Sequence, residues 1–269
     1  MGRNAASYIA GIALLAGVIA APGAAAAVAP SPMVDVEACS ANSLAANDDS
    51  SAAAITLPFE LQFYTRSYDT LWVNNNGNVT FDGPLSTFTP FGLVGTNRAI
   101  IAPFFADVDT RGGGAVTYGW GATTFQGHQA FCATWKDVGY YSGHNDKTNS
   151  FQLLLVERED AKPGAFDIIF NYERVEWETG DASGGSGGLG GSVARAGFSN
   201  GTGADNASYE IVGSGESGAF LDSDPRGLAH RTTQSSTPGR FVWQVRGDAP
   251  IAEYVALGDS YQSGEGSFV

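Results

Sequence analysis

The sequence is poor in basic residues, in histidine and in cysteine. It has 14 Lys and Arg against 28 Asp and Glu, which gives a formal net charge of −14. Such an acidic surface repels the phosphates of nucleic acids and anionic lipid headgroups. The two cysteines and three histidines show no metal-ligand spacing, so a zinc site is not expected. The composition therefore argues against a protein that binds nucleic acid, a membrane surface or zinc.

Long apolar runs are absent after the first 27 residues. Arg3 supplies a short positive region, residues 9–21 are apolar and uncharged, and Ala25–Ala27 form a small-residue cleavage pattern. This combination predicts a secretory signal at 1–27. The apolar run is too short and too rich in Ala and Gly for a membrane anchor, and no basic cluster follows it. We therefore expect a secreted, extracellular protein that does not insert into the membrane.

The two cysteines are Cys39 and Cys132. In the oxidising compartment that export implies, such a pair is more often a disulfide than two free thiols. A lipid anchor on Cys39 is not favoured, because residues 36–38 lack the apolar lead-in that such a site needs. The sequence predicts a disulfide between Cys39 and Cys132.

No stretch after the signal has a convincing helical period, whereas short β patterns recur between Gly-rich turns. The predicted fold is an all-β sandwich over 56–247. Residues 28–55, with their prolines and the Asn47–Ser51 run, are expected to be a leader that is poorly ordered. The predicted strands are 59–63, 71–73, 78–81, 99–105, 115–118, 129–135, 151–157, 166–172, 195–199, 209–212 and 240–245.

Four of these segments carry more detailed predictions. Residues 74–77 (NNNG) predict a tight hairpin turn, since Asn and Gly tolerate positive φ. Residues 151–156 are apolar on both faces, as in a central covered strand. Residues 166–172 alternate as in a strand with one wet face, and a bulge is expected near 173–174. Residues 180–191 contain dinucleotide-binding glycine spacing, but a strand rather than a helix follows, so a surface loop is expected.

Several segments occur together in a characteristic order. They are 71–81 (LWVNNNGNVTF), 101–109 (IAPFFADVD), 131–141 (FCATWKDVGYY), 149–155 (NSFQLLL), 166–177, 195–198 and 239–243. In this order they resemble the nidogen-like (NIDO) domain. The resemblance covers roughly Pro58 to Arg246. It implies an extracellular β-rich module associated with cell–matrix adhesion, without catalytic residues.

The C-terminal stretch 254–266 (YVALGDSYQSGEG) is different. It resembles the first block of a secreted GDSL/SGNH esterase, and this resemblance makes Ser260 the nucleophile. The other residues that such a site needs would lie beyond Val269. We therefore expect residues 248–269 to be a linker and the orphan first strand of a truncated α/β (flavodoxin-like) hydrolase domain. That strand is expected to be poorly ordered and Ser260 inactive, and the chain is expected to be a fragment or a frameshifted product.

Asp107 and Asp109 are the candidate metal ligands. They flank Val108 after an apolar strand, so in an extended chain both side chains point to one face. Oxygen-rich calcium sites use such pairs, and Asp69, Asp82 or backbone carbonyls could complete one. Alternatively, both carboxylates hydrogen-bond the backbone of the turn at 110–114. Calcium is the one cofactor that the sequence suggests.

These features support an extracellular binding module of the adhesion type that would tether an appended esterase and is itself not an enzyme. The expected partner is a component of the extracellular matrix, of a cell wall or of a polysaccharide. A first alternative is the N-terminal part of a secreted SGNH-type esterase. A second is a carbohydrate-binding module, for which five aromatic residues could form a sugar-stacking surface: Trp120, Trp135, Tyr140, Tyr141 and Trp177.

Overall fold

The structure, a computed structural model, describes residues 1–2, 31–34 and 37–247. The described residues from Ser31 onward belong to one unit, and this unit is all-β as predicted. The predicted cleavage site after Ala27 and the predicted hydrolase segment 248–269, with its expected poor order, lie outside the described residues.

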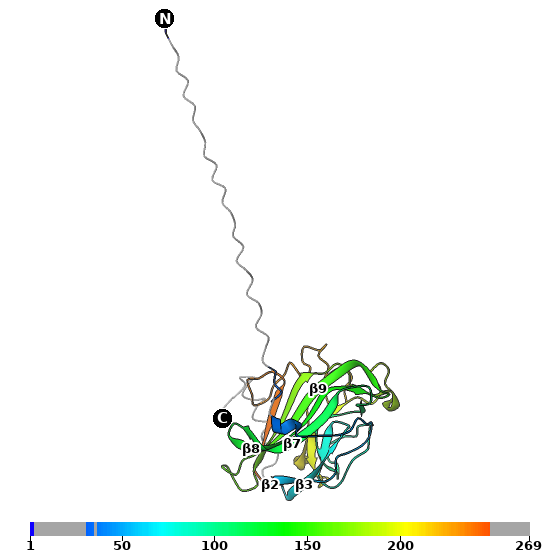
Figure 1. The fold of residues 1–269 in the computed structure, drawn as a ribbon, viewed down its shortest axis with the longest axis vertical. Helices are drawn as coiled ribbons and strands as arrows, with labels where there is room; N and C mark the ends of the chain where they lie inside the picture. The colour runs from blue at the N-terminus through cyan, green and yellow to red at the C-terminus, as the bar shows by residue number, and fades with distance from the viewer. Residues whose placement is uncertain (3–30, 35–36, 248–269) are drawn as a thin grey trace, which may run out of the picture. The chain divides into compact units, whose positions relative to one another are not determined.

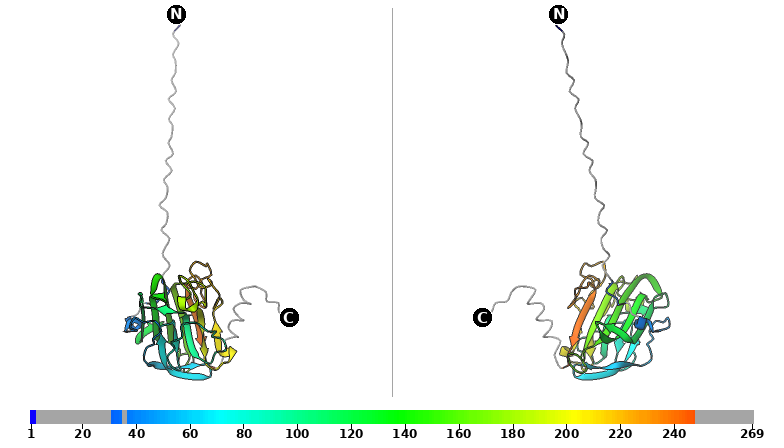
Figure 2. Two further views of the ribbon diagram at one scale, coloured as in Figure 1. Left: turned by 90° about the vertical axis from the view of Figure 1, so that its right-hand side faces the viewer. Right: turned by 60° about the vertical axis from the view of Figure 1, so that its left-hand side comes forward.

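The first antiparallel sheet contains the long strands of the molecule. In spatial order it consists of β1 (Asn42–Ser43), β7 (Ala115–Phe125), β8 (His128–Tyr140), β9 (His144–Glu157), β10 (Phe166–Arg174) and β13 (Arg240–Val245), and the short β6 (Val108–Asp109) also pairs with β8. Strands β7, β8 and β9 lie side by side in Figure 1, and β13 (orange) lies at one edge of the sheet in the right panel of Figure 2. The apolar segment 151–156 in β9 is buried between two neighbouring strands, which confirms its prediction as a central strand.

The second sheet is formed by shorter strands. In spatial order it consists of β12 (Ser208–Glu210), β11 (Arg195–Asn200), β5 (Ala99–Phe105), β4 (Asn78–Thr80), β3 (Arg66–Asn74) and β2 (Ile55–Phe63). Helical structure in the described part of the chain is limited to three short 3₁₀ turns, η1 (Glu37–Ser40), η2 (Asp181–Ser183) and η3 (Asp205–Ala207).

The core lies between the sheets and is rich in aromatic side chains. Trp135 of β8 stacks on Phe151 of β9 with ring centroids 5.1 Å apart, and Phe104 of β5 meets Trp177 edge-on at 5.6 Å. The Tyr172 hydroxyl donates to the backbone carbonyl of Pro103 at 2.6 Å and so joins the first sheet to the second. Burial of each such ring contributes roughly 1.5–3 kcal/mol. Alternating strands place apolar side chains on one face of each sheet, and the two apolar faces pack against each other to form the sandwich.

The predicted hairpin at 74–77 is confirmed. Asn74 pairs with Asn78, and a three-residue loop ends at Gly77 with φ +71°. Gly77 approaches β5 so closely that a Cβ would lie 1.7 Å from the carbonyl oxygen of Phe104. The three asparagines before Gly77 are almost completely buried, unlike those of an ordinary surface turn.

The prediction of a poorly ordered leader up to residue 55 was wrong for its described part. β1 pairs with β7, Ala52 donates its backbone N–H to Val73 at 2.8 Å, and Cys39 is bonded to Cys132 with Cα atoms 5.4 Å apart. The predicted disulfide is therefore present. It holds η1 (blue in Figure 1) against the outer face of the first sheet, where a Cβ at Gly119 would lie 1.6 Å from the carbonyl oxygen of Ala38.

The prediction of a wet face on residues 166–172 was also wrong, although the register shift between Tyr172 and Arg174 is where the bulge was expected. Asp167 is buried between the guanidinium groups of Arg158 and Arg246, at 2.9 and 2.6 Å. Residues 31–34 cover the same face, since the backbone of Val34 exchanges hydrogen bonds with the side chain of Gln152. Polar residues on this strand therefore have protein partners in place of water.

Candidate functional site

Three connecting segments meet where the chain passes between the two sheets. The β1–β2 connection contains Asp48 and Asp49, the β3–β4 turn contains Asn75, and the β5–β6 connection contains Asp107. The Asn75 side-chain amide donates to the carbonyl of Asp48 at 2.5 Å and to that of Val108 at 2.6 Å. This amide therefore holds the first and third segments against each other.

The neighbouring Asn76 completes this arrangement. Its side-chain amide donates to Asp49 Oδ1 at 2.7 Å, and its side-chain oxygen accepts from the backbone N–H of Val108 at 3.0 Å. The β5–β6 connection turns at this point, because the backbone N–H of Val108 also donates to the carbonyl of Ala106 at 2.9 Å. The buried Asn-rich turn is thus a scaffold that fixes the position of three carboxylates.

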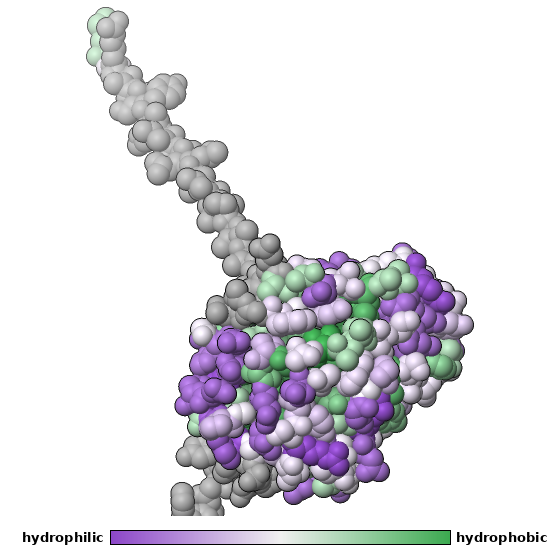
Figure 3. Space-filling view, turned by 60° about the horizontal axis from the view of Figure 1, so that its bottom comes forward, coloured by the Kyte–Doolittle hydropathy of each residue, from purple (hydrophilic) through white to green (hydrophobic). Residues whose placement is uncertain are grey.

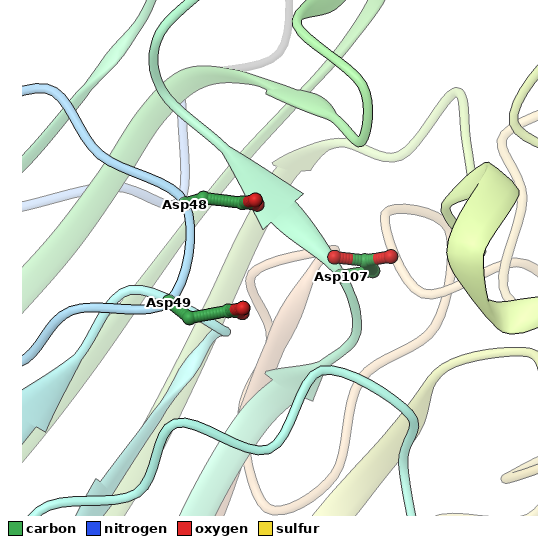
Figure 4. Close-up of side chains that lie close together, drawn as sticks. All are labelled: Asp48, Asp49 and Asp107. Carbon is green, nitrogen blue, oxygen red and sulfur yellow. The ribbon is translucent and has the colours of Figure 1, made fainter.

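The carboxylates of Asp48, Asp49 and Asp107 converge. Each offers one oxygen, and these three oxygens lie within 4.8 Å of one another. Figure 4 shows Asp48 and Asp49 extending from one segment toward Asp107, which turns one carboxylate oxygen toward them. Asp107 is 1% exposed, whereas the other two are partly buried. The arrangement is a cluster of hard oxygen atoms of the kind that can hold a divalent cation.

Two of the three carboxylates have oxygen atoms without a partner. Asp107 Oδ2 and Asp48 Oδ1 are buried and accept no hydrogen bond, and the same holds for the side-chain oxygen of Asn75. Burial raises the pKa of Asp107 to about 7, with a further contribution from nearby aspartates. Burial, then the charges of Asp109 and Asp49, raise the pKa of Asp48 to about 6. Both shifts mean that the protein itself stabilises these negative charges poorly.

Asp109, which was predicted to share a calcium site with Asp107, has other partners. Arg111 donates to both of its oxygens, at 2.9 and 2.5 Å, and the backbone N–H of Gly143 donates to Oδ2 at 2.7 Å. Although burial raises the pKa of Asp109, the hydrogen bonds from Arg111 and Gly143 lower it below the usual value. The turn at Ala106–Val108 breaks the alternation that would have placed both carboxylates together. For Asp109, the alternative of a bond to the following turn holds, because the Arg111 backbone N–H donates to it at 2.9 Å.

The other two suggested ligands are not part of the cluster. Asp82 forms an ion pair with Arg98 at 3.2 Å, and the exposed Asp69 accepts from the hydroxyl of Thr70 at 3.0 Å. Sequence reasoning missed Asp48 and Asp49, which were assigned to the poorly ordered leader. The one available signal was the Asn47–Ser51 run, a density of short polar residues that is also typical of ordinary loops.

The five aromatic residues proposed for a sugar-binding surface are not gathered at the surface. Trp135 and Trp177 are fully buried and donate their indole N–H to backbone carbonyls of Asn75 and Val138, each at 2.9 Å. Tyr140 is 1% exposed and donates its hydroxyl to Asp146 at 2.9 Å. These three residues therefore belong to the core, and a stacking platform made of all five does not form.

The surface is mainly polar. Figure 3 shows one face on which hydrophilic residues lie toward the sides and bottom, with hydrophobic residues in several places between them. Apart from Met1, the large hydrophobic side chains that are exposed in the described part of the chain are Phe88, Val94, Trp120, Leu189 and Val212. None of the described residues forms a helix that is long and apolar enough to cross a bilayer.

Ser260, the predicted nucleophile position, lies outside the described residues. Within the described residues, the side chain of His144 contacts Asp181 at 3.2 Å, and that of His230 contacts the carbonyl of Asp222 at 3.0 Å. Both therefore have partners within the β unit.

Comparison with known proteins agrees with this architecture. A family model for the nidogen-like domain matches residues 69–247. Alpha-tectorin from Mus musculus is 34% identical over an alignment of 224 residues, which covers 74% of this chain and 10% of that protein. Nidogen from Drosophila melanogaster is 28% identical over an alignment of 227 residues, which covers 76% of this chain and 15% of that protein. Nidogen-1 from Homo sapiens is 29% identical over an alignment of 145 residues, which covers 44% of this chain and 12% of that protein.

The chain thus spans only about a tenth to a seventh of the length of these relatives. No solved structure matches it. The family match contains every strand of the second sheet except β2 and the first part of β3, and every strand of the first sheet except β1. The chain therefore belongs to the nidogen-like domain family.

Proposed function

We propose that this chain is a secreted binding module of the adhesion type that holds an appended esterase close to an extracellular matrix, a cell wall or a polysaccharide. The observation that carries the proposal is the nidogen-like match over 69–247, since the matching alpha-tectorin and nidogen are extracellular matrix proteins. The polar surface and the disulfide are consistent with work outside the cell.

The esterase part of the proposal rests on the sequence around Ser260. The sequence of residues 254–266 resembles the start of a GDSL/SGNH domain, a resemblance that predicts a short apolar strand followed by a Gly-Asp-Ser turn. A serine hydroxyl needs an oriented base and an oxyanion hole for efficient attack. We therefore propose that this chain is the binding part and that Ser260 is not catalytic in it; the alternative is the N-terminal part of a secreted SGNH-type esterase.

A carbohydrate-binding module is a weaker alternative. Its support was the set of five aromatic residues, of which Trp135, Tyr140 and Trp177 are now accounted for by core packing. Trp120, 38% exposed, remains accessible on β7. A polysaccharide partner would therefore have to be bound mainly by polar contacts.

Binding is tested by co-sedimentation of the purified protein with insoluble extracellular matrix, bacterial cell wall and polysaccharides such as cellulose and chitin. We expect saturable retention on one of these materials in 0.15 M salt, where long-range charge attraction is largely screened. A folded control protein of similar net charge reports retention by charge alone. Retention no greater than that of the control on every material would contradict the proposal.

Esterase activity is tested with a short-chain aryl ester. We expect no hydrolysis by the purified chain above the buffer rate, and no difference between the parent protein and Ser260→Ala. Hydrolysis that disappears in Ser260→Ala would contradict the assignment of this chain as non-catalytic. It would favour the hydrolase alternative.

A further inference from the structure

The acidic cluster has more negative charge than the surrounding residues neutralise. Asp48, Asp49, Asp107 and Asp109 lie close enough for their charges to interact, and Arg111 is the cation paired with two of them. Its guanidinium bonds Asp109 and reaches Asp48 Oδ2 at 3.0 Å, and it leaves Asp48 Oδ1 without a partner. Like charges at such distances repel one another, and the repulsion is stronger where water is excluded. The cluster therefore has an unmet requirement for positive charge.

Within the cluster, the need for a positive charge is greatest at Asp107. Its side chain is buried, its Oδ2 accepts no hydrogen bond, and a Cβ at Gly180 would lie 2.3 Å from that oxygen. A buried carboxylate without a partner is unfavourable by several kcal/mol unless it is protonated or bound by a cation. One oxygen of the Asp107 carboxylate faces Asp48 and Asp49 (Figure 4), so one cation can contact all three groups at once.

The separation of the ligand atoms fits a calcium ion. Calcium–oxygen distances are about 2.3–2.6 Å, so two oxygens on opposite sides of the ion are up to about 5 Å apart. The three carboxylate oxygens lie within 4.8 Å of one another. Magnesium requires a tighter octahedral arrangement at about 2.0–2.1 Å, and carboxylate oxygens without nitrogen or sulfur favour calcium, magnesium or manganese over zinc and copper.

We propose that Asp48, Asp49 and Asp107 bind one calcium ion, which fastens the β1–β2 connection to the β5–β6 connection. Both connections carry the chain from one sheet to the other. The ion therefore joins the two layers at the same place where Asn75 and Asn76 already hold the segments together. The unpaired side-chain oxygen of Asn75 lies in the same network and is a further candidate ligand. Water molecules supply the rest of the coordination shell.

Calcium binding is measured by isothermal titration calorimetry with calcium chloride and EDTA-treated protein in 0.15 M NaCl at constant pH. We expect one ion per chain with a Kd on the order of 10⁻⁴ to 10⁻³ M, the range of extracellular modules. Asp107→Asn and Asp49→Asn are each expected to weaken binding at least tenfold. Asp69→Asn, which removes the same charge from an exposed site on β3, is expected to change the Kd less than twofold.

Thermal unfolding separates a ligand role from a merely structural one. At a calcium concentration about 100 times the Kd, the parent protein is expected to gain about 5–10 °C in Tm over EDTA. In EDTA, Asp107→Asn is expected to be at least as stable as the parent, because it removes a repelled charge. With saturating calcium the parent is expected to be more stable than Asp107→Asn, because the variant cannot be stabilised by the bound ion.

Three results would overturn the proposal: no saturable binding up to 10 mM calcium, an unchanged Kd in both Asp107→Asn and Asp49→Asn, or equal loss of stability of Asp107→Asn with and without calcium. Equal affinity for magnesium would overturn the choice of ion. If Asp107→Asn does not fold, the partly exposed Asp49→Asn decides the question, since an asparagine there can still accept the Asn76 hydrogen bond.

Discussion

Replacing Cys39 and Cys132 with alanine is expected to lower the free energy of unfolding by about 4–5 kcal/mol. The bridge closes a loop of 93 residues, so its removal returns much conformational freedom to the unfolded chain. It also removes the link that holds η1 on the outer face of the first sheet. Both sulfur atoms are buried in a small apolar cluster with Leu154 and Ile169, so cavities add to the loss. Urea denaturation of the non-reduced proteins measures the difference.

The single variants supply the control. Either substitution removes the bridge, so Cys39→Ala alone, Cys132→Ala alone and the double variant should all show most of the loss. Treatment of the parent protein with a reductant should give a similar loss. A double variant within about 1 kcal/mol of the parent would show that the bridge contributes little.

Gly77→Ala is expected to lower the free energy of unfolding by about 3–4 kcal/mol, or to prevent folding. The left-handed backbone at Gly77 disfavours alanine by roughly 1–2 kcal/mol. The larger part arises because the new Cβ would overlap the Phe104 carbonyl, which belongs to a fully buried strand that cannot shift freely. Thermal and urea unfolding, followed by tryptophan fluorescence, measure the change.

Gly190→Ala is the matched control for this prediction. Gly190 has nearly the same backbone angle, φ +73°, but a Cβ there would meet no atom within 4 Å. It should therefore show the conformational part of the effect alone, about 1–2 kcal/mol. Equal losses in the two variants would show that the contact with β5 is not what makes glycine necessary at position 77.

The strands were predictable because each carries its own local signal. Alternation in 59–63, the apolar run in 151–156 and the Asn-Gly turn at 74–77 are properties of short stretches, and each is confirmed by the structure. The polar ends of β8 and β9 were missed, because residues 136–140 and 144–150 have no regular apolar pattern. They form strands because they pair with each other across the turn at Tyr141–Gly143.

The candidate site was only partly predictable. Asp107 was identified from its place after an apolar strand, but its partners Asp48 and Asp49 are almost 60 residues earlier in the chain. Asp48 and Asp49 lie near Asp107 because the β1–β2 and β5–β6 connections, which both cross between the sheets, lie close together. No local sequence pattern indicates such a long-range contact. Asp109 was assigned to the site by strand alternation, which the turn at Ala106–Val108 interrupts. The site thus depends on how distant segments of the chain pack together, which a local sequence pattern does not show.

The most direct test of the proposed function is the fraction of the protein that stays with insoluble extracellular material from the cells that produce it. The folded protein should be retained in a saturable manner, and Ser260→Ala should be retained equally. The double variant of Cys39 and Cys132 should lose retention in proportion to its loss of folded protein, because the binding surface depends on the sandwich. Equal retention of folded and unfolded protein would show non-specific adsorption and would contradict an adhesion module.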